Sequence, residues 1–325
     1  MSFPDANLLV DAYENPETRS RYEALVVDAV LDPVARAELN AFYNRLNLVA
    51  KALFQVLYWD LFRKRTVEIE PCTWTVDALG ARVDFPLRSE NLWLNWGLSV
   101  SFLGHDLGLK EFYYRVIESR FRPRAFLDVG GNYGTHSLFF LSQGVPTVTL
   151  EPNPGCVQHF RSLLEFNRLR GDIVAAAVGA ESSEATLSFP ERETWLGSVS
   201  VGSDGEGQPQ ENMSTVKVPV VTLDSVVEER ELEPGLIKID TEGFEVPVLH
   251  GSKKTLETHR PMVVFESNTP VERQEIYREF QALGFGIYSL NGALFEGPSP
   301  LSEDALIRDS QANFVALHRE HALLK

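Results

Sequence analysis

The sequence has few cysteines and no long hydrophobic segment. Only two of its 325 residues are cysteines, Cys72 and Cys156, and they are too few and too far apart to indicate a disulfide framework or a zinc site. No hydrophobic segment is long enough to cross a bilayer, and the first residues lack the basic and hydrophobic stretches of a secretion signal. We therefore expect a cytoplasmic protein that does not act at a membrane.

Basic residues are also scarce relative to acidic ones. Lys and Arg total 30 against 46 Asp and Glu, which gives a net charge of −16, and they form no basic cluster along the chain. Binding to a phosphate backbone requires positive surface, so nucleic acid is not an expected partner. The hydrophobic fraction of 44% and the charged fraction of 23% are typical of a globular protein. The length allows one core of ordinary size plus a smaller domain.

The first third of the chain has mainly helical patterning. Hydrophobic residues recur at helical spacing over residues 11–65, which predicts two or three helices. Short β-favouring segments then predict a hairpin or meander, with strands at residues 66–70, 73–76 and 81–85. The aromatic residues that follow, Trp93 and Trp96 among them, are expected to pack in a core, with a wall over a substrate as the alternative. We interpret residues 1–120 as an extension that caps the substrate side.

Residues 121–325 alternate between strand and helix patterns, which predicts an α/β fold with a mostly parallel seven-stranded sheet. The expected strands are residues 125–129, 147–151, 173–178, 236–240, 262–266, 286–290 and 313–317. Two further strands, residues 185–190 and 215–223, flank a loop over residues 197–214 that we expect to be mobile and able to act as a lid. Helices are expected at residues 154–168 and 246–256.

The first of these strands leads into a glycine turn, Gly130-Gly131-Asn132-Tyr133-Gly134. Glycines let the backbone approach a ligand, and the helix that follows presents unpaired N–H groups. The second strand ends at Glu151, about 20 residues further on, as expected for an acid that binds a ribose diol. The two features together predict a nucleotide-cofactor site.

An acidic residue ends each of four predicted core strands. These residues are Asp128, Glu151, Asp240 with Glu242, and Glu266. Ligands of open parallel sheets bind beyond the carboxyl ends of the strands, so the acids are expected to gather at one functional edge. Simpler explanations exist for some of them: Asp128 could only organise the glycine turn, Glu151 could cap a helix, and nearby Glu245 could face solvent.

The motifs resemble the FkbM family of S-adenosylmethionine-dependent methyltransferases over roughly residues 124–290. They are Asp128-Val-Gly-Gly-Asn-Tyr-Gly134, Glu151-Pro-Asn153, Thr222-Leu-Asp-Ser225, Ile237-Lys-Ile-Asp-Thr-Glu-Gly-Phe-Glu245 and Val263-Val-Phe-Glu266. The resemblance implies a class I, Rossmann-like methyltransferase fold in which the glycine turn holds the methionine part of the cofactor and Glu151 the ribose. The expected cofactor contacts are Asp128, Gly130, Asn132, Tyr133, Gly134, Glu151, Asn153, Ala177, Val178 and Asp240. The family commonly has alanine in place of Gly131.

The resemblance implies methyl transfer, and we expect O-methylation of a hydroxyl on a small metabolite, a sugar or a natural-product intermediate. Transfer from a sulfonium requires an aligned acceptor and removal of its proton. We favour Asp240 as the base, with Glu242 beside it, while Lys238 could instead neutralise Asp240 and leave the base role to His136 or Glu266. The same carboxylates could hold a divalent cation, but no motif fixes a complete ligand set, so we favour a site without metal.

Two other functions share parts of this pattern. A nicotinamide-dependent oxidoreductase also uses a glycine turn and a ribose acid, but its Gly-x-Gly-x-x-Gly spacing is missing here. A noncatalytic binding protein could keep the fold without the activity. We expect a small hydroxylated acceptor as the partner and leave a homo-oligomer open.

Overall fold

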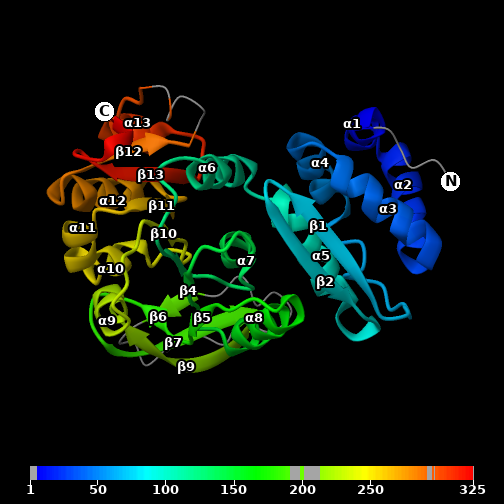
Figure 1. Cartoon of the computed structure of the whole chain (residues 1–325), viewed down its shortest axis with the longest axis horizontal. Helices are drawn as coiled ribbons and strands as arrows, with labels where there is room; N and C mark the ends of the chain where they lie inside the picture. Colours follow the sequence, from blue (N-terminus) through cyan, green and yellow to red (C-terminus); the bar gives the residue numbers. More distant parts are fainter. Residues whose placement is uncertain (1–5, 191–197, 201–212, 291–294, 296, 325) are drawn as a thin grey trace. The chain divides into compact units, whose positions relative to one another are not determined.

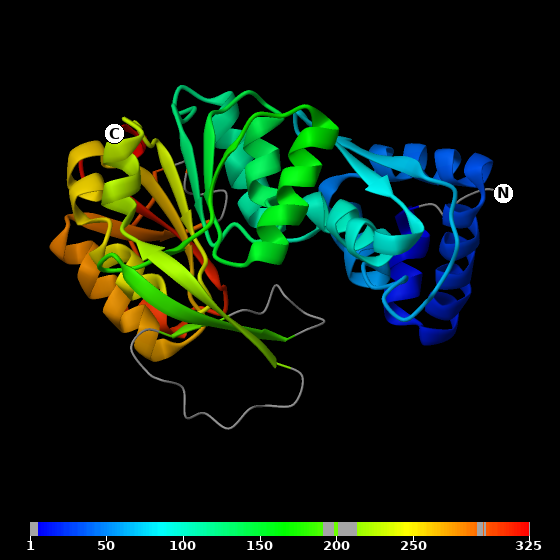
Figure 2. The same ribbon diagram turned by 90° about the horizontal axis from the view of Figure 1, so that it is seen from below.

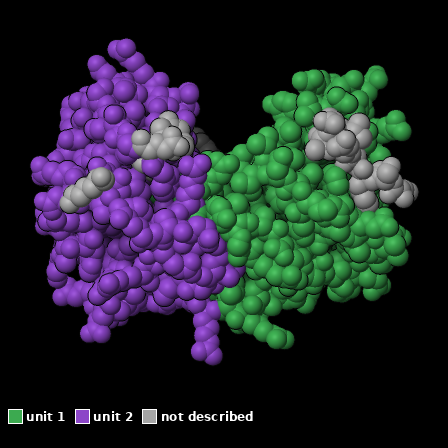
Figure 3. Space-filling view, turned by 45° about the horizontal axis from the view of Figure 1, so that its top comes forward, with its two compact units in different colours: residues 1–114, 163–169 green, residues 115–162, 170–325 purple. Residues whose placement is uncertain are grey.

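The computed structural model describes residues 6–190, 198–200, 213–290, 295 and 297–324. The chain divides into two compact units, which Figure 3 distinguishes by colour. Unit 1 comprises Met1–Tyr114 and Leu163–Leu169, and unit 2 comprises Arg115–Ser162 and Arg170–Lys325.

The described part of unit 1 contains four helices before its hairpin, where two or three were predicted. They are α1 (Ala6–Glu14), α2 (Pro16–Leu31), α3 (Pro33–Arg45) and α4 (Leu48–Tyr58). The breaks are short because single residues cap the next helix: Asn15 accepts hydrogen bonds from the backbone of α2, and Asp32 from that of α3. Proline follows each of these two caps at the first helical position. Hydrophobic spacing alone therefore does not show where one helix ends and the next begins.

The predicted hairpin is confirmed, but the strand predicted at residues 66–70 is wrong. The hairpin pairs β1 (Cys72–Ala78) with β2 (Ala81–Leu87) in antiparallel fashion. The backbone of Ile69 bonds instead to a side chain, since its N–H donates to Ser89 Oγ and its carbonyl accepts from the same hydroxyl. The segment after the hairpin contains η1 (Ser89–Asn91), α5 (Leu92–Gly104) and α6 (Leu107–Glu118).

Trp96 belongs to the aromatic core of unit 1. Its side chain is 0% exposed, its ring centroid lies 4.9 Å from that of Trp74, and its Nε1 donates to the carbonyl of Tyr58 at 2.6 Å. Core packing is therefore confirmed for this residue, and a wall in contact with a substrate is not its role.

Unit 2 is built around a seven-stranded sheet with the order β12-β13-β11-β10-β3-β4-β5. Its strands are β3 (Phe126–Val129), β4 (Thr147–Leu150), β5 (Asp172–Val174), β10 (Leu236–Ile239), β11 (Met262–Glu266), β12 (Phe285–Ser289) and β13 (Asn313–His318). β13 runs antiparallel to both of its neighbours, β11 and β12, and the other neighbouring strands of this sheet are parallel (Figure 1). The predicted α/β fold with a mostly parallel seven-stranded sheet is confirmed.

The predicted third strand, residues 173–178, is two strands in different sheets. Its first part is β5, whereas β6 (Ala177–Val178) pairs with β9 (Met213–Val221) in a second sheet of order β6-β9-β7-β8. The two extra strands predicted at residues 185–190 and 215–223 are confirmed as β7 (Ser183–Pro190) and β9. The sheet also contains β8 (Ser198–Ser200), which lies in the segment predicted as a loop. Most of the predicted lid, residues 201–212, lies outside the described residues.

Helices lie on both faces of the large sheet (Figures 1 and 2). They are α7 (Thr135–Leu141), α8 (Pro154–Asn167), α9 (Leu223–Glu229), α10 (Glu245–His250), α11 (Lys253–His259), α12 (Pro270–Ala282) and α13 (Glu303–Arg308), followed by η3 (Ala322–Leu324). The single helix predicted at residues 246–256 is α10 and α11, separated at Gly251. A side chain at Gly251 would overlap the carbonyl of Gly179, so the chain must turn there without a Cβ.

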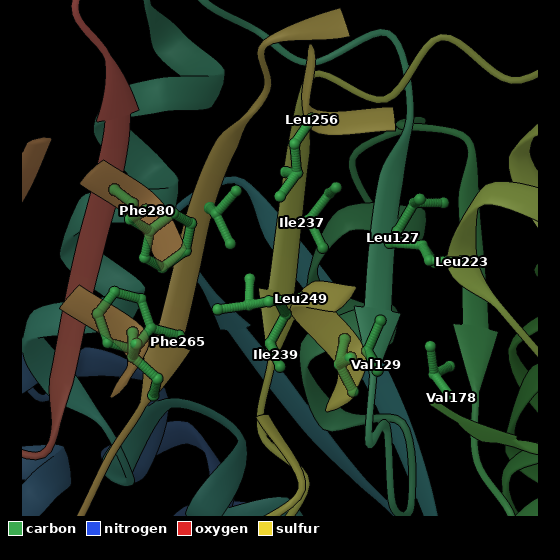
Figure 4. Close-up of a cluster of buried hydrophobic side chains, with 14 of the residues drawn as sticks. Leu127, Val129, Val178, Leu223, Ile237, Ile239, Leu249, Leu256, Phe265 and Phe280 are labelled. Carbon is green, nitrogen blue, oxygen red and sulfur yellow. The ribbon is translucent and has the colours of Figure 1, made fainter. Parts of the chain in front are cut away.

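Alternation along β3 divides its side chains between the two faces. Leu127 and Val129 join the hydrophobic cluster shown in Figure 4, together with Ile237 and Ile239 of β10. Phe126 stacks on Phe140 of α7 with centroids 4.0 Å apart. The core thus fixes where β3 and β10 end.

None of the described helices is long and apolar enough to span a membrane.

Candidate active site

The glycine turn lies at the point where the strand order of the large sheet reverses. From β3 the chain continues toward β4 and β5, and from the neighbouring β10 it continues toward β11. Gly130 has φ +77°, and a Cβ at this position would overlap the carbonyl oxygen of Asp240, the residue after β10. The close approach brings the turn and the β10 loop together where such sheets bind ligands.

Glu151 is held beside the turn by backbone N–H groups. Its Oε2 accepts from the N–H of Asn132 at 2.8 Å, and its Oε1 accepts from the N–H of Asn153 at 2.7 Å. Burial raises the pKa of Glu151 to about 7, against the lowering effect of these two bonds. Each carboxylate oxygen keeps a second lone pair for a hydroxyl. The bond from Asn153, directly before α8, also agrees with helix capping, so binding of a ribose diol stays a prediction.

Asp128 organises the start of α7. Its Oδ2 accepts from Ser137 Oγ at 2.6 Å, and that hydroxyl also lies 2.6 Å from Thr149 Oγ1 of β4. The three buried side chains join β3, β4 and α7 below the glycine turn. Both the explanation that Asp128 organises the glycine turn and its contact with a cofactor stay predictions.

Gly131 is packed against the same group. A Cβ at Gly131 would overlap Cγ2 of Thr149, so we expect Gly131→Ala to destabilise the protein by about 1–3 kcal/mol. Thr149→Ser removes that methyl and keeps the hydroxyl that meets Ser137. Urea unfolding should show the double variant recovering most of the loss. Equal losses in the single and double variants would contradict this explanation.

Asp240 forms an ion pair at the end of β10. Lys238 Nζ donates to Asp240 Oδ2 at 2.7 Å, and the Lys238 side chain is only 3% exposed. A buried ammonium requires a counterion, so Asp240 neutralises Lys238. The structure thus shows the pairing of Lys238 with Asp240 that the sequence analysis gave as an alternative. It also ties up one oxygen of the residue that the sequence favoured as base.

Glu266 ends the adjacent strand β11 and lies beside Asp240. Burial and the charge of Asp240 raise the pKa of Glu266 to about 7, while Asn268 Nδ2 donates to its Oε1 at 3.0 Å. Desolvation and the charge of Asp240 also raise the pKa of Glu242, although its side chain reaches solvent. The structure therefore brings together the three acids predicted at the ends of β10 and β11.

The remaining predicted residues lie on several elements. His136 is buried on α7, and Tyr133 packs edge-on against His159 with centroids 5.4 Å apart. Ala177 and Val178, predicted at the end of the third strand, lie instead on β6 with their side chains in hydrophobic clusters. Their contact with a cofactor stays a prediction.

Glu245 is buried beside the Asp240 loop, which the sequence did not predict. Glu245 is 2% exposed, so the explanation that it faces solvent is wrong. Its Oε1 accepts from both the N–H and the Oγ1 of Thr241, at 2.7 and 2.9 Å. Its position at the end of the Ile237–Glu245 motif, four residues after Thr241, was the available signal. Nothing local in the sequence indicates Glu272.

No group of three or more acidic, histidine or cysteine side chains is arranged to hold a metal ion in the described part of the chain. The preference for a site without metal stays a prediction.

Unit 1 contains a separate groove of about 730 Å³ between α3 and the hairpin. The amides of Asn40 and Asn44 in its wall bond to the backbone of Thr75 along the edge of β1, and Arg82 pairs with Asp77. These polar groups serve the unit itself, and we assign no ligand to the groove.

Comparison with known proteins identifies the segment that carries the site. The sequence model of the methyltransferase FkbM domain matches residues 128–287. Residues 128–287 are a methyltransferase FkbM domain. The resemblance inferred from the motifs is thereby confirmed. The FkbM domain runs from Asp128 in β3 to Ile287 in β12, and it contains all the predicted cofactor and catalytic residues.

The proteins similar to this chain include a curated relative and several solved structures. The hexuronic acid methyltransferase AglP of Haloferax volcanii is 28% identical over 172 residues, which are 52% of this chain and 66% of that protein. The methyltransferase FkbM of Methylobacillus flagellatus is 12% identical with a TM-score of 0.37, covering 85% of this chain and 62% of that one. The Podospora anserina methyltransferase PaMTH1, solved with SAH bound, is 10% identical with a TM-score of 0.36, covering 68% and 82%. The chain thus spans just under two thirds of the first two proteins.

Proposed function

We propose that this protein uses S-adenosylmethionine to methylate a hydroxyl oxygen of a sugar or another small hydroxylated metabolite, such as a natural-product intermediate. One observation carries the proposal most: the FkbM domain covers the glycine turn, Glu151 and the acids that follow β10 and β11. The name of the Haloferax volcanii relative, a hexuronic acid methyltransferase, supports a sugar-like acceptor.

The residues of the glycine turn fit the cofactor. The close approach of Gly130 to the β10 loop leaves backbone rather than side chains around the turn, and Glu151 presents acceptors to a diol. When bound, S-adenosylmethionine supplies a methyl group on a positively charged sulfur that an oxygen nucleophile can displace. The nearby Asp240 and Glu266 carboxylates favour binding of a positive group.

Glu266 is the residue that we propose as general base. A base works best when its pKa lies near the working pH, and burial with the charge of Asp240 raises that of Glu266 to about 7. Asp240 is instead paired with Lys238. In this proposal the hydroxyl proton of the acceptor passes to Glu266, and Asp240 sets the basicity of Glu266.

Cofactor binding tests the proposal first. Calorimetry should show that the protein binds S-adenosylhomocysteine and not NAD, with weaker binding at pH 6 than at pH 8, because Glu151 must be ionised to accept hydrogen bonds from hydroxyls. Glu151→Gln should weaken binding by about 10- to 100-fold, since an amide nitrogen then faces a backbone donor. It should also remove the pH dependence.

Other results would favour the alternatives. Preferred binding of NAD would indicate an oxidoreductase, and binding of neither compound would indicate a noncatalytic protein. If the homocysteine compound binds, mass spectrometry with labelled donor and candidate sugars identifies the acceptor. A methyl ether survives mild alkali, whereas a methyl ester formed on a uronic acid carboxylate does not. We also propose a cytoplasmic location, since neither Cys72 nor Cys156 forms a disulfide.

A further inference from the structure

We propose that Glu245 is a positioning residue that fastens the Asp240 loop to the segment after β11 through a proton shared with Glu272. The bonding of its two oxygens differs. Oε1 accepts two hydrogen bonds from Thr241, whereas Oε2 is buried and has no donor among the described residues. An ionised carboxylate would leave that oxygen unsatisfied, but a protonated one can donate from it.

The acceptor for this proton is the carboxylate of Glu272 on α12. Glu272 lies on the helix that packs against α10, and its Oε2 already accepts from Ser267 Oγ at 2.6 Å and from the N–H of Asn268 at 3.2 Å. Burial and the contact with Glu272 raise the pKa of Glu245 to about 8. Burial opposes ionisation of Glu272 too, but the bonds from Glu245, Ser267 and Asn268 outweigh it and lower its pKa. Glu245 is therefore the partner that carries the proton.

The pair connects the two strand ends that bear the proposed chemistry. Thr241 follows Asp240 directly, so the bonds from Glu245 fix the loop after β10. Glu272 fixes Ser267 and Asn268, and Asn268 Nδ2 donates to Glu266. The positions of Asp240 and Glu266 therefore both depend on the proton that Glu245 shares with Glu272.

The other charged groups around α10 and α12 are engaged elsewhere. Arg273 donates to backbone carbonyls of residues 267, 306, 309 and 311, and Lys238 pairs with Asp240. Both His250 and Lys253 pair with Glu279. Glu242 reaches solvent on the same loop. Among the described residues, no cation is recorded on Glu245 or Glu272 that could replace the proton.

The pH dependence follows from the direction of the shift. Because the pKa of Glu245 is higher in the folded state than its ordinary value of 4.5, its contribution to stability is complete below about pH 4.5 and is lost as pH rises through about 8. Above that pH the buried Glu245 carboxylate and the partly buried Glu272 carboxylate are both ionised and repel each other, so the loop is released. Glu245→Gln mimics the protonated form, since its oxygen accepts from Thr241 and its nitrogen donates to Glu272.

Hydrogen exchange of the segment 236–245 tests this without reference to the enzyme's activity. After correction for intrinsic rates, the wild-type segment should exchange about 10-fold faster at pH 9 than at pH 7, relative to a segment of unit 1 such as α2. Glu245→Gln should show no such change, while Glu245→Leu, which cannot accept from Thr241, should exchange fast at both values. A wild-type response retained in Glu245→Gln would overturn the proposal, as would slow exchange in Glu245→Leu.

A role in turnover rests on the proposed function and needs a second measurement. The methyl-transfer kcat of the wild type should fall about 10-fold per pH unit above pH 8, and Glu245→Gln should remove this fall while changing S-adenosylhomocysteine affinity less than about threefold. If the wild type transfers no methyl group, the proposed function fails while the exchange result still decides the role of Glu245. If kcat of Glu245→Gln falls like that of the wild type, the positioning role is wrong.

Discussion

Gly130→Ala should be among the most damaging single substitutions in this protein, lowering the free energy of unfolding by about 2–5 kcal/mol. An L residue at φ +77° costs about 1–2 kcal/mol, and the added Cβ would overlap the carbonyl oxygen of Asp240. Relief requires that β3 and β10 separate at their carboxyl ends, where the site is formed. Denaturant unfolding measures the loss, and calorimetry should show S-adenosylhomocysteine affinity reduced at least about 10-fold.

Gly144→Ala is the matched control. Gly144 has φ +73°, nearly the same backbone strain, but nothing lies within 4 Å of an added Cβ. Its expected cost is therefore the conformational part alone, about 1–2 kcal/mol, without an effect on cofactor affinity. Equal losses in the two variants would show that the contact with Asp240 does not matter.

Local sequence was enough to predict the elements that end at the site. The β3 and β10 strands are short hydrophobic segments with a following glycine or acid, and each predicted range agrees with the structure to within one residue at either end. The segment around Ala177 failed because its pairing with Val220 is set more than 40 residues away. The pattern of a continuous hydrophobic segment does not indicate which distant strand will pair with it.

The site shows the same division between local and distant determinants. Glu151 was predicted because its spacing from the glycine turn is a local property of one strand-helix-strand unit. Burial of Glu245 depends on how α10 packs against α12, which carries Glu272. The protonation of Glu245 depends on a carboxylate far away in the sequence, so the residues next to Glu245 in the sequence do not indicate it.

Glu266→Gln should reduce the methyl-transfer kcat by about 10²- to 10⁴-fold, the usual contribution of a general base. Glutamine keeps the size of the side chain and can still accept from Asn268, but it cannot take a proton. Because the pKa of Glu266 is raised to about 7, wild-type kcat/KM for the acceptor should rise as pH increases through about 7. The variant should lack that rise, while its S-adenosylhomocysteine affinity changes little.

Asp240→Asn distinguishes the role of Asp240 from that of Glu266. This substitution should act on the stability of the protein and on the basicity of Glu266. It leaves the buried Lys238 ammonium without its counterion, so the free energy of unfolding should fall by about 3–5 kcal/mol. Loss of the Asp240 charge lowers the pKa of Glu266, so the onset of activity in any folded variant should move to lower pH. If Asp240→Asn abolishes this pH dependence and Glu266→Gln keeps it, Asp240 is the base. If neither variant abolishes the pH dependence, the acceptor has no proton to lose, as in a uronic acid carboxylate.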